Sequence, residues 1–308
     1  MTDNYIIVNG RYIPVKYRNK NTHWTWMNPD WLGDLSKLTP DLLQLALPLE
    51  EDMKKLNDLS GQEYLNHYIA EFYANELRSS WQIEGEHLDT LQLRSALVRH
   101  LCLDVPEWFY PKVNVRTERE NNAVKAALYL INSKDMLSLE QILETHKLLR
   151  EDDSDKEKNN FGRFRDSNEI VGFLSKDARY YEIVFEAPPS EDVQYLMQQY
   201  IQWWHKSYEL VPLSIGAALA HLYFVEIHPF HDGNGRMARL LLDTYLANKP
   251  KNLFRPYSMQ SILHTHRFDD ESTLHKNSAI TGASLPKKIK ILPFESISRP
   301  RKGSQPLS

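Results

Sequence analysis

Cysteine is almost absent from this sequence, which has a single one, Cys102, among 308 residues. A lone cysteine excludes an internal disulfide framework, so the fold must be stabilised by burial of apolar side chains. Cys102 lies in the helix-like run ALVRHLCL, where we expect it to be a small buried residue. The lack of disulfides is typical of a reducing compartment, and we expect the protein to be cytoplasmic.

Long apolar runs and a strong net charge are missing as well. No stretch approaches the roughly 20 apolar residues that cross a bilayer, and the N-terminus lacks the pattern of a secretory signal, so we expect no membrane partner. The net charge of -4 gives no general attraction to nucleic acid or anionic lipid. The chain is 42% hydrophobic and 25% charged, which is typical of one large globular domain or two ordinary ones.

Helical periodicity dominates the residues that are present. Between Thr39 and Arg99, apolar residues recur at i, i+3 and i+4 spacing, which predicts helices with one face toward a core. The clearest such stripe consists of Tyr64, Leu65, Tyr68, Ile69, Phe72, Tyr73 and Leu77. Gly85 is predicted to end this helix, and another is expected from about Asp89.

The later part of the chain predicts further helices. They are expected over 117–132, 138–150, 190–208 and 212–226, with another directly after residue 235. Ser138 and Gln141 have the spacing of a capping box, which favours a helix start at residue 138. A polar, mostly acidic stretch at 151–160 is interpreted as a solvated loop.

Strand signals are confined to two short hairpins. Residues 5–17 place β-rich runs on both sides of Asn9-Gly10, a pair that favours a type I′ turn. Residues 170–185 place β-branched and aromatic runs around a charged middle. The tryptophan-rich stretch 24–31 is interpreted as a loop that packs on the body of the protein. The sequence therefore predicts a mainly α fold with two small hairpins.

The C-terminal stretch 282–308 is basic and rich in proline and serine, which predicts a weakly structured tail. Its six basic side chains are a weak signal for nucleic acid, which we do not expect as a partner.

The strongest pattern is HPFHDGNGRMAR at residues 228–239. Pro229 is predicted to stop one helix, and the next begins after the glycines, so Gly233 to Gly235 form a turn at a helix N-terminus. Successive N–H groups in such a turn bind anions, and the helix dipole adds to the attraction. Arg236 and Arg239 share one face of the new helix, and two guanidiniums suit a chain of phosphates.

Three other side chains of this pattern can complete the chemistry of a phosphate site. Asp232 can hold Mg²⁺, which binds few carboxylates together with substrate phosphates. Asn234 can donate to a phosphate oxygen, and His228 can act as general base for an attacking hydroxyl. A zinc site with His221 and His231 is the alternative, but no cysteine accompanies the histidines and a separate carboxylate would be needed.

This constellation resembles the signature of the Fic (Fic/Doc) family, because every fixed position of that signature is matched. The matching residues are His228, Pro229, Phe230, Gly233, Asn234, Gly235, Arg236 and Arg239, with Asp232 at the acidic position. FGRFR at 161–165 also resembles the segment before the family's flap, and the hairpin 170–185 stands where the flap is expected. The resemblance covers about residues 115–250 and implies a mainly α, Fic-type helical core with a short β-hairpin flap.

The resemblance implies a protein adenylyltransferase that moves AMP from ATP to a Ser, Thr or Tyr hydroxyl of a target protein or of itself. His228 would take the hydroxyl proton, and Asp232 would carry Mg²⁺. The turn from Gly233 to Gly235, with Asn234, would hold the phosphates. Arg236 would grip the chain nearer the reacting end, and Arg239 would grip the γ-phosphate. The flap would hold the target by strand addition.

A second pattern lies upstream, where residues 79–86 read SSWQIEGE. Ser80, Glu84 and Gly85 fit the family's inhibitory helix, which implies that Glu84 pairs with Arg239 in the place of the γ-phosphate. The short pattern alone favours a solvated Glu84 at a helix end, and its occurrence together with the long motif favours the inhibitory role. The N-terminal region also resembles the domain that precedes some bacterial Fic cores.

Three regions are therefore predicted: an N-terminal region at 1–111 with the inhibitory helix, a catalytic core at 112–260 and a C-terminal extension at 261–308. After about Arg255 the sequence departs from the family's helical pattern, and it leaves no room for the winged-helix domain of many relatives. Two alternatives remain open: removal of AMP by the same residues, or a nucleotide-sensing interaction module. The base preference of the pocket, the target and a homodimer also remain open.

Overall fold

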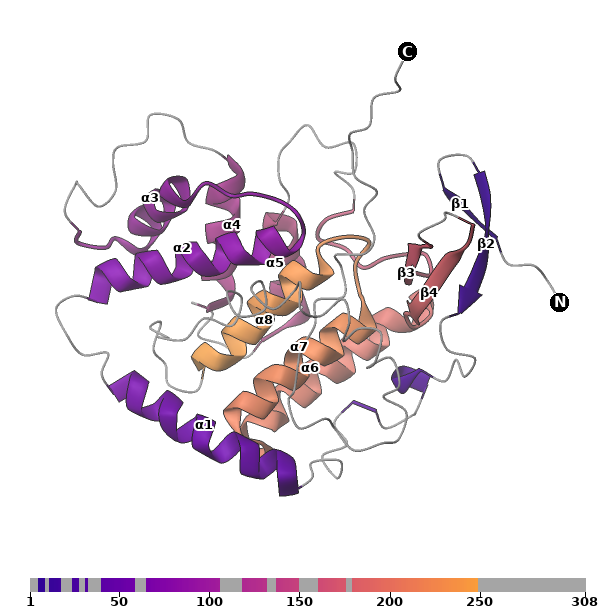
Figure 1. Ribbon diagram of the computed structural model, residues 1–308. Coiled ribbons are helices and arrows are strands. Elements are labelled where there is room, and N and C mark those ends of the chain that lie inside the picture. Colours follow the sequence, from indigo (N-terminus) through magenta and orange to yellow (C-terminus); the bar gives the residue numbers. More distant parts are fainter. Residues whose placement is uncertain are drawn as a thin grey trace, which may run out of the picture.

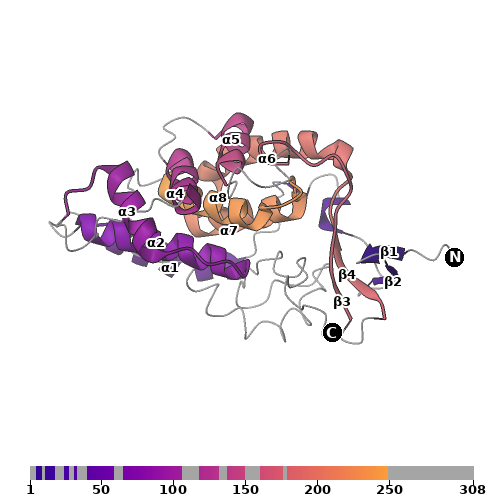
Figure 2. The same ribbon diagram turned by 90° about the horizontal axis from the view of Figure 1, so that it is seen from above.

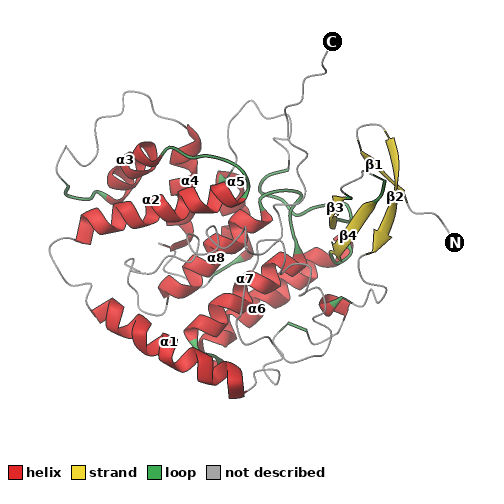
Figure 3. Cartoon of the chain, in the orientation of Figure 1, coloured by secondary structure: helices red, strands yellow, loops and turns green. Residues whose placement is uncertain are grey.

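The structure is a computed structural model of the 308-residue chain. It describes residues 5–8, 11–17, 24–27, 31–32, 40–58, 65–105, 118–131, 137–149, 160–175 and 179–248. The predicted Asn9-Gly10 turn, the loop at 151–159, the boundary near residue 111 and the C-terminal extension lie outside these ranges. Within them the fold is mainly α, as predicted (Figure 3).

The helices of the described residues follow the predicted order. They are α1 (Pro40–Asp58), α2 (Leu65–Ile83), α3 (Thr90–Leu101), α4 (Glu118–Ile131), α5 (Leu139–Leu148), α6 (Val193–Leu210), α7 (Leu213–Ile227) and α8 (Asn234–Asn248). Short 3₁₀ turns lie at Thr25–Met27 and Ser190–Asp192. Among the described residues, no helix has the length and apolarity that crossing a membrane would require.

Helix α7 is largely apolar and ten of its 15 residues are buried, so it lies at the centre of the helical body. It packs against α6, α8 and α1. In Figure 1, α6 runs beside α7, and α1 crosses near one end of it. Gly216 allows α8 to approach closely, since a Cβ there would lie 2.2 Å from the hydroxyl oxygen of Tyr245. This contact fixes α7 against α8, and the HPFHDGNGR turn joins these two helices.

Helix ends follow the predicted capping chemistry. Gly85 has a φ of 78° and follows the end of α2. Asp89 caps α3 by accepting the N–H of Gln92, and Ser138 and Gln141 form the predicted capping box of α5.

Two sequence-based expectations for side chains are wrong. Tyr68 belongs to the apolar stripe of α2, but 63% of its surface is exposed, whereas Ile69, Tyr73 and Leu77 are buried as predicted. Cys102 is exposed and is not a buried helical residue. It follows the last residue of α3 in the left-handed conformation, with a φ of 49°, which ends the helix and turns the side chain outward.

The two predicted hairpins join into one four-stranded sheet, which the sequence analysis did not anticipate. The strands are β1 (Tyr5–Val8), β2 (Arg11–Tyr17), β3 (Ile170–Leu174) and β4 (Tyr181–Glu186), in the order β1-β2-β4-β3. Both hairpins are antiparallel, and β2 pairs with β4 in parallel, with Val15 opposite Tyr181. The sheet projects from one end of the helical body (Figure 2).

The tryptophan-rich stretch packs on the body of the protein, as predicted. The Trp24 ring lies edge-on to Phe185 of β4, with centroids 5.5 Å apart. Trp26 donates its indole N–H to the carbonyl oxygen of Glu186 at 2.7 Å. Trp31 is buried against Tyr223 of α7. The aromatic rings therefore connect the sheet and α7 to the segment between them.

Candidate active site

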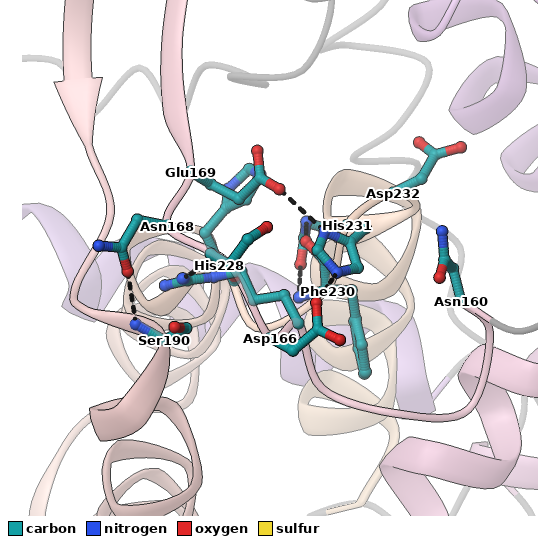
Figure 4. A network of polar contacts seen from close by, with 12 residues as sticks. Asn160, Asp166, Asn168, Glu169, Ser190, His228, Phe230, His231 and Asp232 are labelled. Carbon is teal, nitrogen blue, oxygen red and sulfur yellow. Dashed lines mark hydrogen bonds and ion pairs between the residues drawn. The ribbon is translucent and has the colours of Figure 1, made fainter.

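The turn between α7 and α8 has an unusual backbone at its first residue. His228 has a φ of 50°, a left-handed conformation that a residue with a Cβ rarely adopts. Its N–H still donates to the carbonyl oxygen of Phe224, and Pro229 follows, which excludes further right-handed helix. The backbone thus places the His228 side chain at the exit from α7, beside the turn (Figure 4).

Asn234, the first residue of α8, closes this turn. Its side-chain oxygen accepts the Phe230 N–H at 2.9 Å, and its side-chain nitrogen donates to the Phe230 carbonyl oxygen at 2.7 Å. Only 1% of Asn234 is exposed. The predicted phosphate contact of Asn234 stays a prediction, and the structure shows that its amide holds the turn.

The anion-binding turn is built around Gly233, which has a φ of 78°. A Cβ at this position would lie 3.3 Å from Nε2 of His146, so both the backbone angle and the space favour glycine. Gly235 lies in the first turn of α8, where backbone N–H groups and the helix dipole favour an anion.

Asp232 offers one carboxylate beside the turn. Its Oδ1 accepts the Gly233 N–H at 2.8 Å, and its Oδ2 lies 3.6 Å from a guanidinium nitrogen of Arg236. Within the described ranges no three potential metal ligands converge. The donor set therefore fits Mg²⁺ held largely by substrate phosphates, and it does not support the zinc alternative with His221 and His231.

The imidazole of His228 is held as a neutral base. Nδ1 lies 3.3 Å from the carbonyl oxygen of Val225, and because a carbonyl oxygen only accepts, Nδ1 carries the proton and Nε2 is left as an acceptor. Burial lowers the pKa of His228 to about 4, with a smaller opposing contribution from the Val225 bond. The side chain is therefore unprotonated at neutral pH, the form that a general base needs.

Arg165 fixes the backbone around His228 and was given no role from the sequence, although it ends the FGRFR segment. Its guanidinium donates to the carbonyl oxygens of His228 at 2.7 Å, Ser167 at 2.8 Å and Pro188 at 2.5 Å. Its own N–H donates to the Pro229 carbonyl oxygen at 2.9 Å. A guanidinium can reach several carbonyls at once because its donors form a planar fork. Arg165 thus connects the segment before the flap, the end of β4 and the turn.

His146 of α5 supports the other side of the turn and was also missed. Its Nδ1 accepts the Gly162 N–H at 2.9 Å, so Nε2 carries the proton and donates to the Asp232 carbonyl oxygen at 2.9 Å. The ring stacks on Phe230 with centroids 3.6 Å apart. Burial lowers its pKa to about 4. No local sequence signal marks such a residue, because its burial on α5 is seen only in the folded structure.

His231 connects the turn to the segment before the flap. Its Nδ1 lies 2.9 Å from Glu169 Oε1 and its Nε2 lies 3.1 Å from Asp166 Oδ1 (Figure 4). The hydrogen bond from His231 lowers the pKa of Asp166. Nearby, Asn168 accepts the N–H of Ser190 at 2.8 Å. Both ring nitrogens of His231 therefore contact carboxylates of the segment before the flap.

Arg239 is 1% exposed and is bound by the end of α2. Its Nε donates to the Ser80 hydroxyl at 2.7 Å, and one terminal nitrogen donates to the Ser80 carbonyl oxygen at 3.0 Å. The same nitrogen lies 2.6 Å from Glu84 Oε1. The structure thus brings Ser80, Glu84 and Arg239 together across more than 150 residues of sequence. Ser80 lies in the last turn of α2, and Glu84 and Gly85 follow directly after its last residue.

Arg236 is equally buried, with 2% of its surface exposed. Its guanidinium carbon lies 5.6 Å from the ring centroid of Trp81, a cation–π contact. Both arginines of α8 therefore face α2, and His228, Asp232 and the glycine turn lie at the N-terminal end of the same helix.

Comparison with known proteins gives a consistent picture for this region. Residues 136–246 match the model of the Fic/DOC family. The chain is 29% identical over 208 residues to "Protein adenylyltransferase Fic" of Aedes aegypti, covering 65% of this chain and 36% of the relative. It is 31% identical over 183 residues to the protein of that name in Drosophila willistoni, covering 57% and 32%. The chain thus spans about a third of the length of these curated relatives.

Solved structures support the same fold. A Fic family protein from Desulfovibrio desulfuricans superimposes with a TM-score of 0.54 at 22% identity, over 77% of this chain and 66% of the other. Fic-1 from C. elegans superimposes with a TM-score of 0.51 at 20% identity, over 78% and 68%. At these identities the likeness concerns the fold and not the activity.

Proposed function

We propose that the chain is an autoinhibited protein adenylyltransferase, because residues 136–246 match the model of the Fic/DOC family. It would transfer AMP from ATP to a Ser, Thr or Tyr hydroxyl of a target protein or of itself. The observation that carries this proposal is the contact between Glu84 and Arg239, at 2.6 Å, on the helix that begins at the glycine turn beside the neutral His228. The adenylyltransferase names of the insect relatives support the reaction class.

The reaction begins with removal of a proton by His228. Nε2 accepts the proton of the target hydroxyl while the hydroxyl oxygen attacks the α-phosphorus of ATP. The bond between the α-phosphorus and the oxygen that bridges to the β-phosphate then breaks, and pyrophosphate leaves. The glycine turn and Arg236 neutralise charge on the phosphate chain. Asp232 would hold Mg²⁺, which would supply positive charge to the phosphates of the substrate.

Autoinhibition follows from the position of Glu84. Arg239 is the residue that the family resemblance assigns to the γ-phosphate, and in this structure its guanidinium binds Ser80 and Glu84 instead. The Glu84 side chain is 11% exposed, so the ion pair is weakly screened by solvent and competes strongly with a phosphate. ATP would then bind with its γ-phosphate displaced, and the α-phosphorus would not be aligned with His228.

Target binding would use strand β3 of the flap. The outer edge of β4 is already paired with β2, so β3 is the edge of the flap hairpin that no other described strand occupies. A target segment can add there through main-chain hydrogen bonds, which gives modest side-chain specificity. Glu169, bonded to His231 of the turn, directly precedes this strand and places it next to the reacting groups.

The test is transfer of label from ATP radiolabelled at the α-phosphate. Glu84→Gly should label itself or a target more strongly than the wild type, and Glu84→Gly combined with His228→Ala should show no labelling. Mass spectrometry of a lysate treated with the Glu84→Gly enzyme and ATP would then identify the modified hydroxyl by its added AMP. Labelling by Glu84→Gly that does not exceed that of His228→Ala would contradict the proposal.

The reverse reaction is the second candidate, because the Glu84 carboxylate lies within the site and could orient a water molecule for removal of AMP. A pre-modified target distinguishes the two. Loss of AMP with the wild type but not with Glu84→Gly favours removal, and equal loss with both excludes that role of Glu84. A non-enzymatic nucleotide sensor would need neither His228 as a neutral base nor Asp232.

A further inference from the structure

A second glutamate lies at the end of the inhibitory segment. Glu86 follows Gly85, and one of its carboxylate oxygens lies 4.0 Å from NH1 of Arg236. Its side chain is 12% exposed and that of Arg236 is 2% exposed, so little solvent separates the two charges. The sequence IEGE therefore places one carboxylate on each of the two motif arginines, Glu84 on Arg239 and Glu86 on Arg236.

Glu86 is also bound from another element. The same carboxylate oxygen accepts a hydrogen bond from Arg119, in the first turn of α4. The neighbouring Glu120 accepts the N–H of Asp89 at 3.0 Å, so two residues of this turn hold the segment that follows α2. Arg119 and Arg236 thus share one carboxylate, and Arg119 is the closer of the two.

We propose that Glu86 is a second acidic residue that opposes nucleotide binding, that it acts on Arg236, and that Arg119 sets how strongly it acts. The proposal rests on the proposed function, since it concerns the same phosphate site. A phosphate that approaches Arg236 meets the negative charge of Glu86. Arg119 partly neutralises that charge and draws the carboxylate away from Arg236.

The two glutamates therefore differ in the nucleotide that they oppose. Glu84 binds the arginine that is assigned to the γ-phosphate. Its charge should therefore weaken the binding of ATP and affect the binding of ADP much less. Glu86 lies against the arginine assigned to phosphates nearer the reacting end, which both nucleotides possess. Glu86 should therefore weaken the binding of ADP and ATP alike, and ADP binding separates its effect from that of Glu84.

The experiment is titration calorimetry of the full chain with ATP and with ADP, in the presence of Mg²⁺. Glu86→Gln should bind both nucleotides about tenfold more tightly, at the low end of the couplings measured for close charge pairs. Arg119→Gln should bind both more weakly, because the charge of Glu86 near Arg236 is then no longer partly neutralised by Arg119. The double variant should return close to the wild type. Glu84→Gln is the matched control, and it should tighten the binding of ATP more than the binding of ADP.

Opposite signs for Glu86→Gln and Arg119→Gln are the decisive result, since a purely structural ion pair would weaken binding in both variants. Thermal unfolding of each variant verifies that it is folded, and Glu86→Asp, which keeps the charge on a shorter side chain, should stay nearer to the wild type. Two results would overturn this inference alone. In the first, Glu86→Gln and Arg119→Gln change nucleotide affinity in the same direction. In the second, Glu86→Gln does not tighten binding although Glu84→Gln tightens the binding of ATP. If no variant binds ATP, the proposed function fails as well.

Discussion

The two sides of the proposed nucleotide site are held by different kinds of contact. The turn from His228 to Asn234 is held mainly by backbone hydrogen bonds, by stacked rings and by the buried guanidinium of Arg165. Its charged contacts are those of His231 with two carboxylates and the 3.6 Å approach of Asp232 to Arg236. The end of α2 is attached to the same site through carboxylate–guanidinium pairs, Glu84 with Arg239 and Glu86 with Arg119.

This difference separates the part of the site that must stay fixed from the part that a substrate can replace. Neutral and backbone contacts do not compete with a phosphate, so nucleotide binding leaves the turn in place. A carboxylate binds an arginine through the same kind of charged hydrogen bond as a phosphate but carries less negative charge than a triphosphate, so a triphosphate can displace it. The account therefore predicts that changes on the turn side abolish function and that changes on the α2 side increase it.

The largest effect is expected from Arg165→Ala, which removes the cation of the turn side. The carbonyls of His228, Ser167 and Pro188 lose their donor, and the expected loss is about 3 kcal/mol of unfolding free energy. In the Glu84→Gly background, AMP transfer should fall by roughly 100-fold through misplacement of His228. Denaturant unfolding and label transfer measure the two effects. Arg165→Lys should not restore transfer, since an ammonium lacks the planar fork.

An intermediate effect is expected from His221→Leu, at a neutral histidine on α7. His221 is buried, neither ring nitrogen has a partner among the described residues, and burial lowers its pKa to about 3. The unfolded state binds a proton below its ordinary pKa of about 6.5, whereas the folded state does not, so stability falls as the pH drops below 6.5. At pH 5 this costs about 2 kcal/mol.

Leucine at residue 221 cannot titrate, so the variant should lose about 2 kcal/mol less than the wild type between pH 7 and pH 5. Urea unfolding of both proteins at both pH values gives the double difference, in which the contributions of His146 and His228 cancel. An equal loss in the two proteins would show that His221 is not buried as a neutral side chain.

The smallest effect concerns the pH dependence of transfer. Because the pKa of His228 is lowered to about 4, its base form is complete well below neutrality, and protonation should reduce the rate only below about pH 5. With the Glu84→Gly enzyme, kcat/KM should show no loss attributable to a histidine between pH 5.5 and 8. An acidic limb with a midpoint near 6.5 would instead indicate a solvated imidazole and would weaken the contrast between the two sides.

Local chemistry allowed much of this site to be predicted from the sequence. Caps at Asp89 and Ser138, the stop at Gly85 and the motif turn are each encoded by a few adjacent residues, and the structure has them where they were expected. The contact of Glu84 with Arg239 was expected from the family resemblance alone, because nothing local relates two residues so distant in sequence.

Other features depend on contacts for which the sequence holds no local signal. The parallel pairing of β2 with β4 joins distant strands, and neither strand carries a mark of its partner. Arg165 and His146 bond to backbone groups of the turn. Because every residue has a backbone carbonyl, the sequence does not show which of them will accept these hydrogen bonds. Tyr68 fits the helical period, yet it is exposed, because periodicity gives the direction of a side chain and not what covers it.

The central claim is that Glu84 and the γ-phosphate of ATP compete for Arg239. A crystal structure of the Glu84→Gly protein with ATP tests it most directly. The account predicts the triphosphate along the turn from Gly233 to Gly235, the γ-phosphate on Arg239 and Nε2 of His228 facing the α-phosphorus. Phosphates bound elsewhere, or an Arg239 that contacts only Ser80 while ATP is present, would contradict it.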